Sequence, residues 1–155
     1  MATLERAIAI ALHAHAGHTD KAGGPYILHP LRVMLAMPNP TEQIAAVLHD
    51  VIEDSSLTIE DLRREGFGDQ VLAIVEALTR RAGENYEDYV QRVGRHRPAI
   101  PVKLADLRDN MDFSRLAVLT EQDMERLARY HRAYRYLIDR RSGQNPDKPE
   151  TKGTG

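Results

Sequence analysis

The chain has 155 residues, of which 42% are hydrophobic and 28% are charged, a balance typical of one globular domain. The formal net charge is −2 at pH 7, which does not favour binding along a nucleic-acid backbone. The absence of cysteine excludes disulfides, thiolate nucleophiles, zinc fingers and iron–sulfur clusters. No apolar run approaches the ~18 residues of a membrane span, and charges and histidines interrupt the stretch from Met1 to Gly17. We therefore expect a cytoplasmic protein without a membrane segment or signal peptide.

The spacing of apolar residues predicts helices along the whole chain. In the N-terminal part we expect a helix capped by Thr3, a loop over residues 18–25, a short helix from Pro30 through Met37, and a helix capped by Thr41 that runs through Asp54. Further on we expect helices over residues 70–80, 86–93 and 98–111, and a last helix that follows Thr120 and reaches Arg141. Capping-box spacing occurs at Thr58 with Asp61 and at Asn85 with Asp88.

No segment alternates in the way that a strand requires, so the sequence predicts an all-α domain over residues 1–141. Residues 142–155 are rich in Gly, Pro, Lys and Thr, and we expect this tail to be disordered.

One helical segment combines a histidine with three acidic residues. His49 and Asp50 are followed four positions later by Glu53 and Asp54. At ~100° per residue, an uninterrupted helix would bury its apolar side and present His49, Asp50 and Glu53 on the other, with Asp54 at the edge. Carboxylates this close repel each other, and a divalent cation would remove that cost. The alternative is an acidic face that is simply solvated.

Two other segments favour the metal. His29 lies between apolar residues and a proline, where a single histidine is ordinarily a core residue. Lys103, Asp106 and Asn110 share one stripe of a predicted helix beside an apolar stripe, and a carboxylate so near the core needs a partner. His29, His49, Asp50 and Asp106 would together form a mixed nitrogen and oxygen donor set suited to manganese, iron or zinc.

These residues resemble the pattern of HD-domain metal phosphohydrolases. Three segments carry a more specific resemblance: residues 21–30 (KAGGPYILHP), 48–54 (LHDVIED) and 102–106 (VKLAD) with Asn110. They are similar to the hydrolase domain of RelA/SpoT-type enzymes, which degrade the guanosine alarmones (p)ppGpp. The resemblance extends from about Leu4 to Arg141 and is strongest to small alarmone hydrolases that consist of this domain alone. It implies an HD-domain helical bundle and release of the 3′-pyrophosphate to give GDP or GTP.

The resemblance also implies a role for individual residues. His29, His49, Asp50 and Asp106 would hold one Mn²⁺ ion. Glu53 and Asp54 would orient or deprotonate the attacking water. The residues that it implies for nucleotide binding are Lys21, Asn110, Arg126 and Tyr130. We add Lys103 to this set, because its positive charge could form part of a rim that attracts phosphate.

The pattern departs from the long enzymes near the nucleotide. Asp20 stands where they usually carry an arginine, and Ala22 replaces a frequent serine. The preference between ppGpp and pppGpp therefore stays open, as do the metal, the oligomeric state and the regulation. The alternatives are a phosphatase for another nucleotide, such as NADPH or a nucleoside monophosphate, and a catalytically silent nucleotide-binding module. In each case the expected partner is a small nucleotide, with no nucleic acid or membrane.

Overall fold

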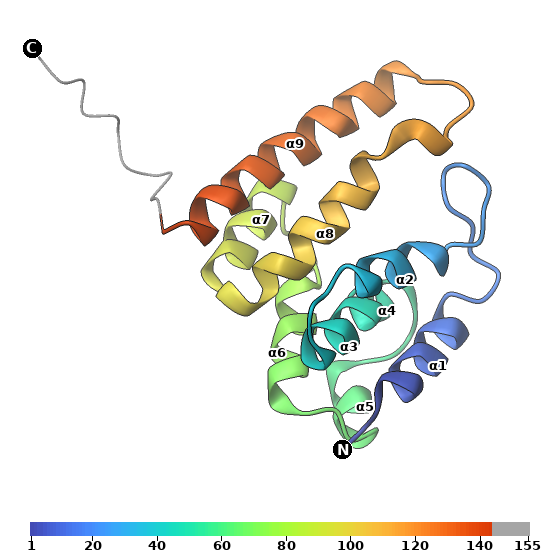
Figure 1. Cartoon of the computed structure of the whole chain (residues 1–155), viewed down its shortest axis with the longest axis vertical. Coiled ribbons are helices and arrows are strands. Elements are labelled where there is room, and N and C mark those ends of the chain that lie inside the picture. The colour runs from blue at the N-terminus through green and yellow to red at the C-terminus, as the bar shows by residue number, and fades with distance from the viewer. Residues whose placement is uncertain (144–155) are drawn as a thin grey trace, which may run out of the picture.

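The computed structural model describes residues 1–143, so all but the first two residues of the tail discussed above lie outside the described residues (Figure 1). The α-helices are α1 (Leu4–Ala14), α2 (Leu28–Leu35), α3 (Pro40–Leu48), α4 (Val51–Asp54), α5 (Ile59–Arg64), α6 (Asp69–Leu78), α7 (Tyr86–Arg95), α8 (Ile100–Met111) and α9 (Glu121–Arg141). Short 3₁₀ turns, η1 (Arg97–Ala99) and η2 (Phe113–Arg115), precede and follow α8. Within residues 1–143 the only β pairing is an isolated bridge between Thr19 and Pro25. The all-α prediction is confirmed.

Side-chain caps start several helices where the sequence predicts them. Thr58 and Thr120 form complete capping boxes at the starts of α5 and α9. Thr3 and Asn85 accept hydrogen bonds from the backbone N–H groups of the first turns of α1 and α7. These caps satisfy N–H groups that otherwise lack a partner within the helix.

The helix expected from Thr41 to Asp54 is instead two helices. Asn39 caps α3, with Pro40 in the first turn, and the helix ends at Leu48. The ring Nδ1 of His49 lies 2.6 Å from the carbonyl oxygen of Ala46, which would accept from the N–H of Asp50 in an uninterrupted helix. This competing bond turns the chain at His49 and Asp50 before α4 begins.

The second helix also starts earlier than predicted. It begins at Leu28, so Pro30 is its third residue rather than its first. This is still within the first turn, where the missing proline N–H costs no helical hydrogen bond.

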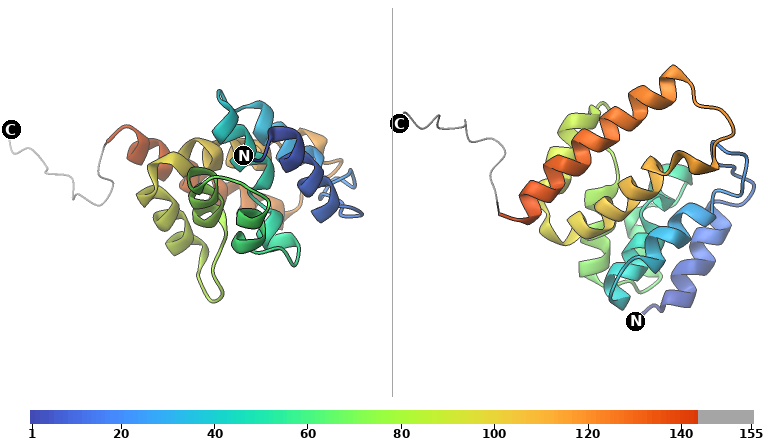
Figure 2. Two further views of the ribbon diagram at one scale, coloured as in Figure 1. Left: turned by 90° about the horizontal axis from the view of Figure 1, so that it is seen from below. Right: turned by 45° about the horizontal axis from the view of Figure 1, so that its top comes forward.

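Helix α3 lies at the centre of the bundle and packs against α1, α2 and α6 (Figures 1 and 2). Its last four residues, Ala45 to Leu48, are completely buried. Helix α8 packs against α2 on one side and against α9 on the other, and α9 also contacts α7. The segments that carry the histidines and aspartates of interest are therefore fixed against each other through the core. No helix in the described part of the chain is both long and apolar enough to span a membrane.

Candidate metal centre

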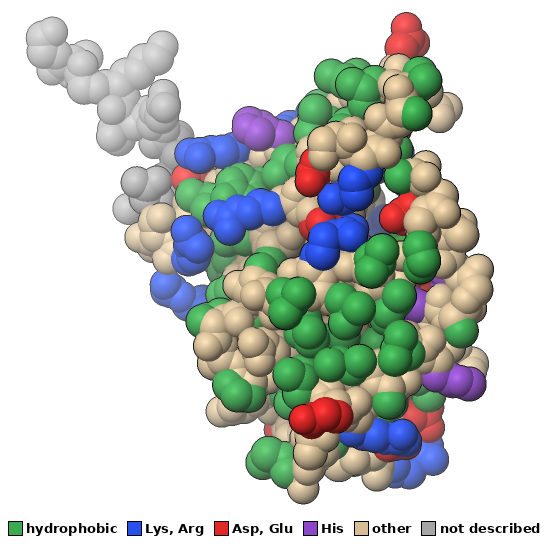
Figure 3. Space-filling view, turned by 45° about the vertical axis from the view of Figure 1, so that its right-hand side comes forward, with side chains coloured by type: hydrophobic (Ala, Val, Ile, Leu, Met, Phe, Trp, Pro, Cys, Tyr) green, Lys and Arg blue, Asp and Glu red, His purple; other side chains and the backbone are tan. Residues whose placement is uncertain are grey.

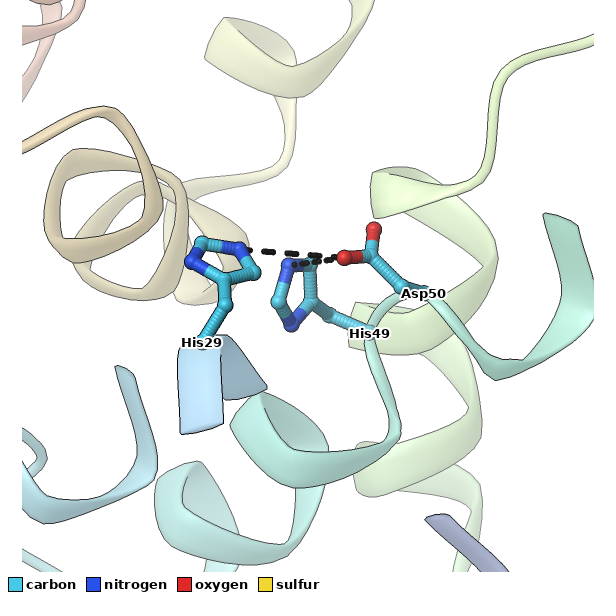
Figure 4. A group of neighbouring side chains, drawn as sticks. All are labelled: His29, His49 and Asp50. Atoms are coloured by element: carbon cyan, nitrogen blue, oxygen red, sulfur yellow. Dashed lines mark ion pairs between the residues drawn. The ribbon is translucent and has the colours of Figure 1, made fainter. Parts of the chain in front are cut away.

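Four side chains from three separate segments, His29, His49, Asp50 and Asp106, converge between α2, α3 and α8. His29 Nε2 lies 2.9 Å from Asp106 Oδ1 and 3.7 Å from Asp50 Oδ2. His49 Nε2 lies 3.1 Å from the same oxygen of Asp50 and 3.4 Å from Asp106 Oδ1. Figure 4 shows both imidazoles directed at the Asp50 carboxylate. One ligand atom from each of His29, His49 and Asp50 lies within 4.8 Å of the others, as a shared cation requires.

The other ring nitrogens fix the orientation of both imidazoles. Nδ1 of His29 lies 2.6 Å from Asp109 Oδ2, and Nδ1 of His49 lies 2.6 Å from the carbonyl oxygen of Ala46. Both partners are acceptors, so each Nδ1 carries the proton and donates. In each neutral ring, Nε2 then has the free lone pair, and both Nε2 atoms face the carboxylates of Asp50 and Asp106.

One buried atom supports a cation directly. Nε2 of His49 has no aligned hydrogen-bond partner among the described residues, although two carboxylate oxygens surround it. A buried polar atom without a partner is expensive, and a bound cation would provide one. Two imidazoles and two carboxylates are also a donor set that divalent transition metals accept. The residues therefore fit a metal ion.

In the protein without metal, the imidazoles and carboxylates stabilise each other's charged forms. Burial by itself would lower the pKa of His29, but hydrogen bonds with Asp106 and Asp109 outweigh it and raise this pKa. Burial also opposes the charge on His49, but Asp50 and Asp106 raise its pKa well above the usual value. Burial would raise the pKa of Asp50, yet the charge of His49 lowers it to about 2.

Asp106 is held by neighbours from its own helix. Lys103 Nζ lies 2.7 Å from Asp106 Oδ2, and Asn110 Nδ2 donates to Asp106 Oδ1 over 3.0 Å. Lys103 is itself buried, and its ammonium group lies 5.0 Å from the ring centre of Tyr89. Burial would raise the pKa of Asp106, but Lys103 and His29 hold it well below the usual range. Lys103 thus touches the candidate metal ligand, not the open pocket where the nucleotide contacts were expected.

A pocket of about 460 Å³ opens beside the four converging side chains. Its lining contains four of the residues expected to contact the nucleotide: Lys21, Asn110, Arg126 and Tyr130. His29 also lines it, which connects the pocket to the candidate metal centre. Figure 3 shows acidic and basic side chains facing each other around a hollow on this side of the molecule. The pocket therefore joins the candidate metal centre to cationic and aromatic groups.

The loop that carries Lys21 is folded by Asp20. Asp20 Oδ1 accepts hydrogen bonds from the backbone N–H groups of Ala22, at 2.9 Å, and Gly24, at 2.8 Å. The acidic residue that departs from the long enzymes thus has a structural partner in its own loop.

Glu53 and Asp54 lie on α4, beyond Asp50. Glu53 Oε1 accepts a hydrogen bond of 2.6 Å from the backbone N–H of Arg80. Asp54 Oδ2 lies 3.7 Å from Nδ1 of the buried His15. Burial raises the pKa of both carboxyl groups, and the charge of Asp50 adds to this effect. Both carboxylates are therefore stronger proton acceptors than exposed ones.

The sequence analysis missed two residues that touch the candidate ligands. Asp109 holds His29, and the Tyr26 hydroxyl donates to Asp50 Oδ2 over 2.5 Å. Both belong to segments that were already of interest, since Tyr26 precedes His29 by three positions and Asp109 follows Asp106 by three. The spacing of residues within each segment does not reveal contacts between segments that are far apart in the chain.

The chain matches the HD domain family over residues 7–111. It is 33% identical over 139 residues to a GTP pyrophosphokinase of Streptomyces coelicolor, covering 81% of this chain and 16% of that protein. It is 32% identical over 138 residues to a guanosine-3′,5′-bis(diphosphate) 3′-pyrophosphohydrolase of Aquifex aeolicus, covering 81% and 19% respectively. The chain thus spans a fifth or less of the length of these relatives.

A solved structure is also similar. It is that of a metazoan ortholog of SpoT, a protein that hydrolyzes ppGpp and plays a role in starvation responses. The TM-score is 0.72 at 23% sequence identity, and the match covers 95% of this chain and 89% of that one. This likeness establishes the shared helical fold, and the sequence matches confirm the resemblance inferred from the motifs. The chain therefore belongs to the HD domain family and is an HD domain of the RelA/SpoT type.

Proposed function

We propose that this chain is a Mn²⁺-dependent hydrolase of the guanosine alarmones (p)ppGpp, which releases the 3′-pyrophosphate and leaves GDP or GTP. The observation that carries the proposal is the convergence of His29, His49, Asp50 and Asp106, with both Nε2 atoms facing the two carboxylates. The names of the relatives from Aquifex aeolicus and of the metazoan SpoT ortholog supply the substrate class.

His29, His49, Asp50 and Asp106 would hold the metal ion. Two nitrogen and two oxygen ligands suit manganese and leave room in its coordination sphere for water and a phosphate oxygen. When bound, the cation lowers the pKa of its water and offsets negative charge on the phosphate. Asp109 and Ala46 would keep the imidazoles in the tautomer that binds metal.

Glu53 and Asp54 would receive the proton of the attacking water. Their raised pKa values make each a stronger base than an exposed carboxylate. Glu53 is anchored by the Arg80 backbone, which suits a group that orients water. Asp54 lacks such an anchor to the backbone among the described residues and is the better candidate to move with the proton.

The pocket would receive the rest of the nucleotide. Lys21 and Arg126 supply positive charge for phosphates, and Tyr130 supplies an aromatic surface for the base or ribose. Asn110 would help through Asp106, to which its amide donates. Lys103 would act by holding the same carboxylate rather than by touching the nucleotide. The mixture of acidic and basic lining residues, with a net charge of −2, favours a small nucleotide over a nucleic acid.

The test is hydrolysis of ppGpp by the purified chain loaded with Mn²⁺. We expect GDP and pyrophosphate in equal amounts, and loss of both products in Asp106→Asn. Glu76→Gln removes one acidic side chain from an exposed position on α6 and serves as the matched control. Turnover of NADPH or a nucleoside monophosphate, without pyrophosphate release from ppGpp, would show that the substrate is that other nucleotide and not ppGpp. Metal binding and ppGpp binding without any turnover would identify a silent nucleotide-binding module.

A further inference from the structure

His15 is a buried histidine that the proposed mechanism does not use. It follows the last residue of α1, and only 2% of its surface is exposed. Neither ring nitrogen has a hydrogen-bond partner among the described residues. A leucine would fill such a position without the cost of burying two polar atoms. The imidazole therefore needs an explanation other than packing.

Its surroundings connect it to the acidic pair. His15 Nδ1 lies 3.7 Å from Asp54 Oδ2, so a small rotation of either side chain would bring them into hydrogen-bond distance. The ring centres of Tyr26 and His15 lie 5.0 Å apart, and the Tyr26 hydroxyl donates to Asp50 Oδ2. Among the described residues, Asp54 provides the one carboxylate oxygen within ion-pair distance of His15.

The charge state of His15 suits a neutral donor. Burial lowers the pKa of His15, and although Asp50 opposes this effect, the neighbouring histidines add to it. A neutral imidazole can donate from Nδ1 without placing a positive charge beside Asp54. It would therefore orient this carboxylate and leave it free to accept a proton, whereas a cation in the same place would weaken it as a base.

We propose that His15 is a positioning residue for Asp54, whose carboxylate it holds toward the attacking water by donating from Nδ1. This inference rests on the proposed function, because it assigns the orientation of a base in that reaction. Hydrogen bonds of this kind are often long in a free enzyme and shorten when substrate binds, which fits the separation of 3.7 Å. His15 acts through Asp54 and does not touch the nucleotide.

Two amide substitutions separate positioning from packing. In His15→Asn the amide nitrogen can occupy the place of Nδ1, whereas in His15→Gln it reaches toward the place of Nε2. Both variants keep a polar side chain of similar size. We expect His15→Gln to lower kcat for ppGpp about 10-fold to 100-fold, with KM unchanged within about twofold, since Asp54 is misplaced while the pocket is intact. His15→Asn should restore most of that kcat.

The Asp54→Asn background provides the next comparison. There the His15→Gln substitution should cause no further loss of kcat, because the group that His15 positions has already lost its function. Equal kcat values for His15→Asn and His15→Gln at equal Tm, or an undiminished effect of His15→Gln in the Asp54→Asn background, would overturn the inference.

A spectroscopic measurement keeps the inference separate from the proposed reaction. In ¹⁵N-labelled protein, the imidazole shifts of His15, assigned by their loss in His15→Gln, should show the proton on Nδ1. The Nδ1 resonance should move in Asp54→Asn. A proton on Nε2, or a resonance that does not respond to Asp54, would overturn the positioning role. Absence of pyrophosphate release by the unmodified protein would instead refute the proposed function, and the spectra would still test the contact.

Discussion

Nδ1 of His29 lies 2.6 Å from Oδ2 of Asp109, a residue 80 positions later in the chain. Arg32 holds both oxygens of the same carboxylate, with Nε 2.7 Å from Asp109 Oδ1 and Nη2 3.0 Å from Asp109 Oδ2. Burial would raise the pKa of Asp109, but His29 and Arg32 keep it below the usual range, so the carboxylate stays ionised as an acceptor. A residue outside the candidate ligand set thus decides which nitrogen of His29 faces Asp106.

Removing this carboxylate should weaken metal binding. We expect Asp109→Ala to raise the Kd for Mn²⁺ about 10-fold to 100-fold, because the His29 ring loses the acceptor that fixes its tautomer. Asp109→Asn should have a smaller effect, since a carboxamide oxygen can still accept from Nδ1. Titration calorimetry of the metal-free variants measures both values. An unchanged Kd for Asp109→Ala would show that His29 does not depend on this contact.

Metal binding should also depend on pH. The pKa values of His29 and His49 are raised in the metal-free fold. Their ion pairs therefore contribute full stability below the pKa of an unfolded histidine, ~6.5. This contribution is lost as the pH rises through the raised pKa values of the folded protein. Metal needs the neutral imidazoles, so its affinity should rise over that same window, which lies above ~6.5. For each proton that the metal displaces, the affinity for the metal should rise about tenfold per pH unit.

Calorimetry in two buffers with different ionisation enthalpies measures the protons released when Mn²⁺ binds. We expect net release at pH 7, with the same value in His131→Gln, which removes an exposed histidine of α9. Binding without proton release at this pH would contradict the raised pKa values.

Lys103 should be more important for stability than for nucleotide binding. Lys103→Met leaves the buried Asp106 without its ammonium partner, and we expect the free energy of unfolding to fall by about 3 kcal/mol without metal. The loss should be smaller with Mn²⁺, because the metal offsets the same carboxylate. Urea unfolding with and without Mn²⁺ measures the difference. Lys21→Met, at an exposed site in the pocket, should change stability by less than about 0.5 kcal/mol. Equal losses in the two variants would exclude a buried ion pair.

The sequence was most informative where a structural rule is local. Caps at Thr58 and Asn85 depend on residues three positions apart, and each side chain accepts a hydrogen bond from the backbone N–H three positions later, where the spacing predicts a cap. The break at His49 was missed because apolar spacing continues through Val51 and Ile52, as it would in one helix. What ends α3 is a bond from the His49 ring to the Ala46 carbonyl, which hydrophobic periodicity does not reveal.

Long-range contacts were the least predictable part of the candidate site. Asp106 was expected to need a partner, but the sequence could not tell whether Lys103 would neutralise it or point into the pocket. In the structure Lys103 is buried, with its ammonium group over the ring of Tyr89 on α7 and 2.7 Å from Asp106 Oδ2, so it neutralises the carboxylate. The pairing of Asp109 with His29 likewise depends on how α2 and α8 pack. The chemistry of His29, His49, Asp50 and Asp106 suggested that they could share a cation, but their assignment as the ligands of one Mn²⁺ ion came only from the resemblance to a known family.

The acidic pair gives a final prediction that separates catalysis from metal binding. Asp54→Asn keeps the size of the side chain but removes its capacity to accept a proton, so we expect kcat for ppGpp to fall about 10²-fold to 10⁴-fold. The Kd for Mn²⁺ should change little, because Asp54 does not belong to the group of candidate metal ligands formed by His29, His49 and Asp50. Steady-state kinetics and metal titration of the same preparation measure the two quantities. If the variant bound Mn²⁺ normally and hydrolysed ppGpp as fast as the parent, Asp54 would not be the base, and Glu53, held by the Arg80 backbone, would be the remaining carboxylate of the pair.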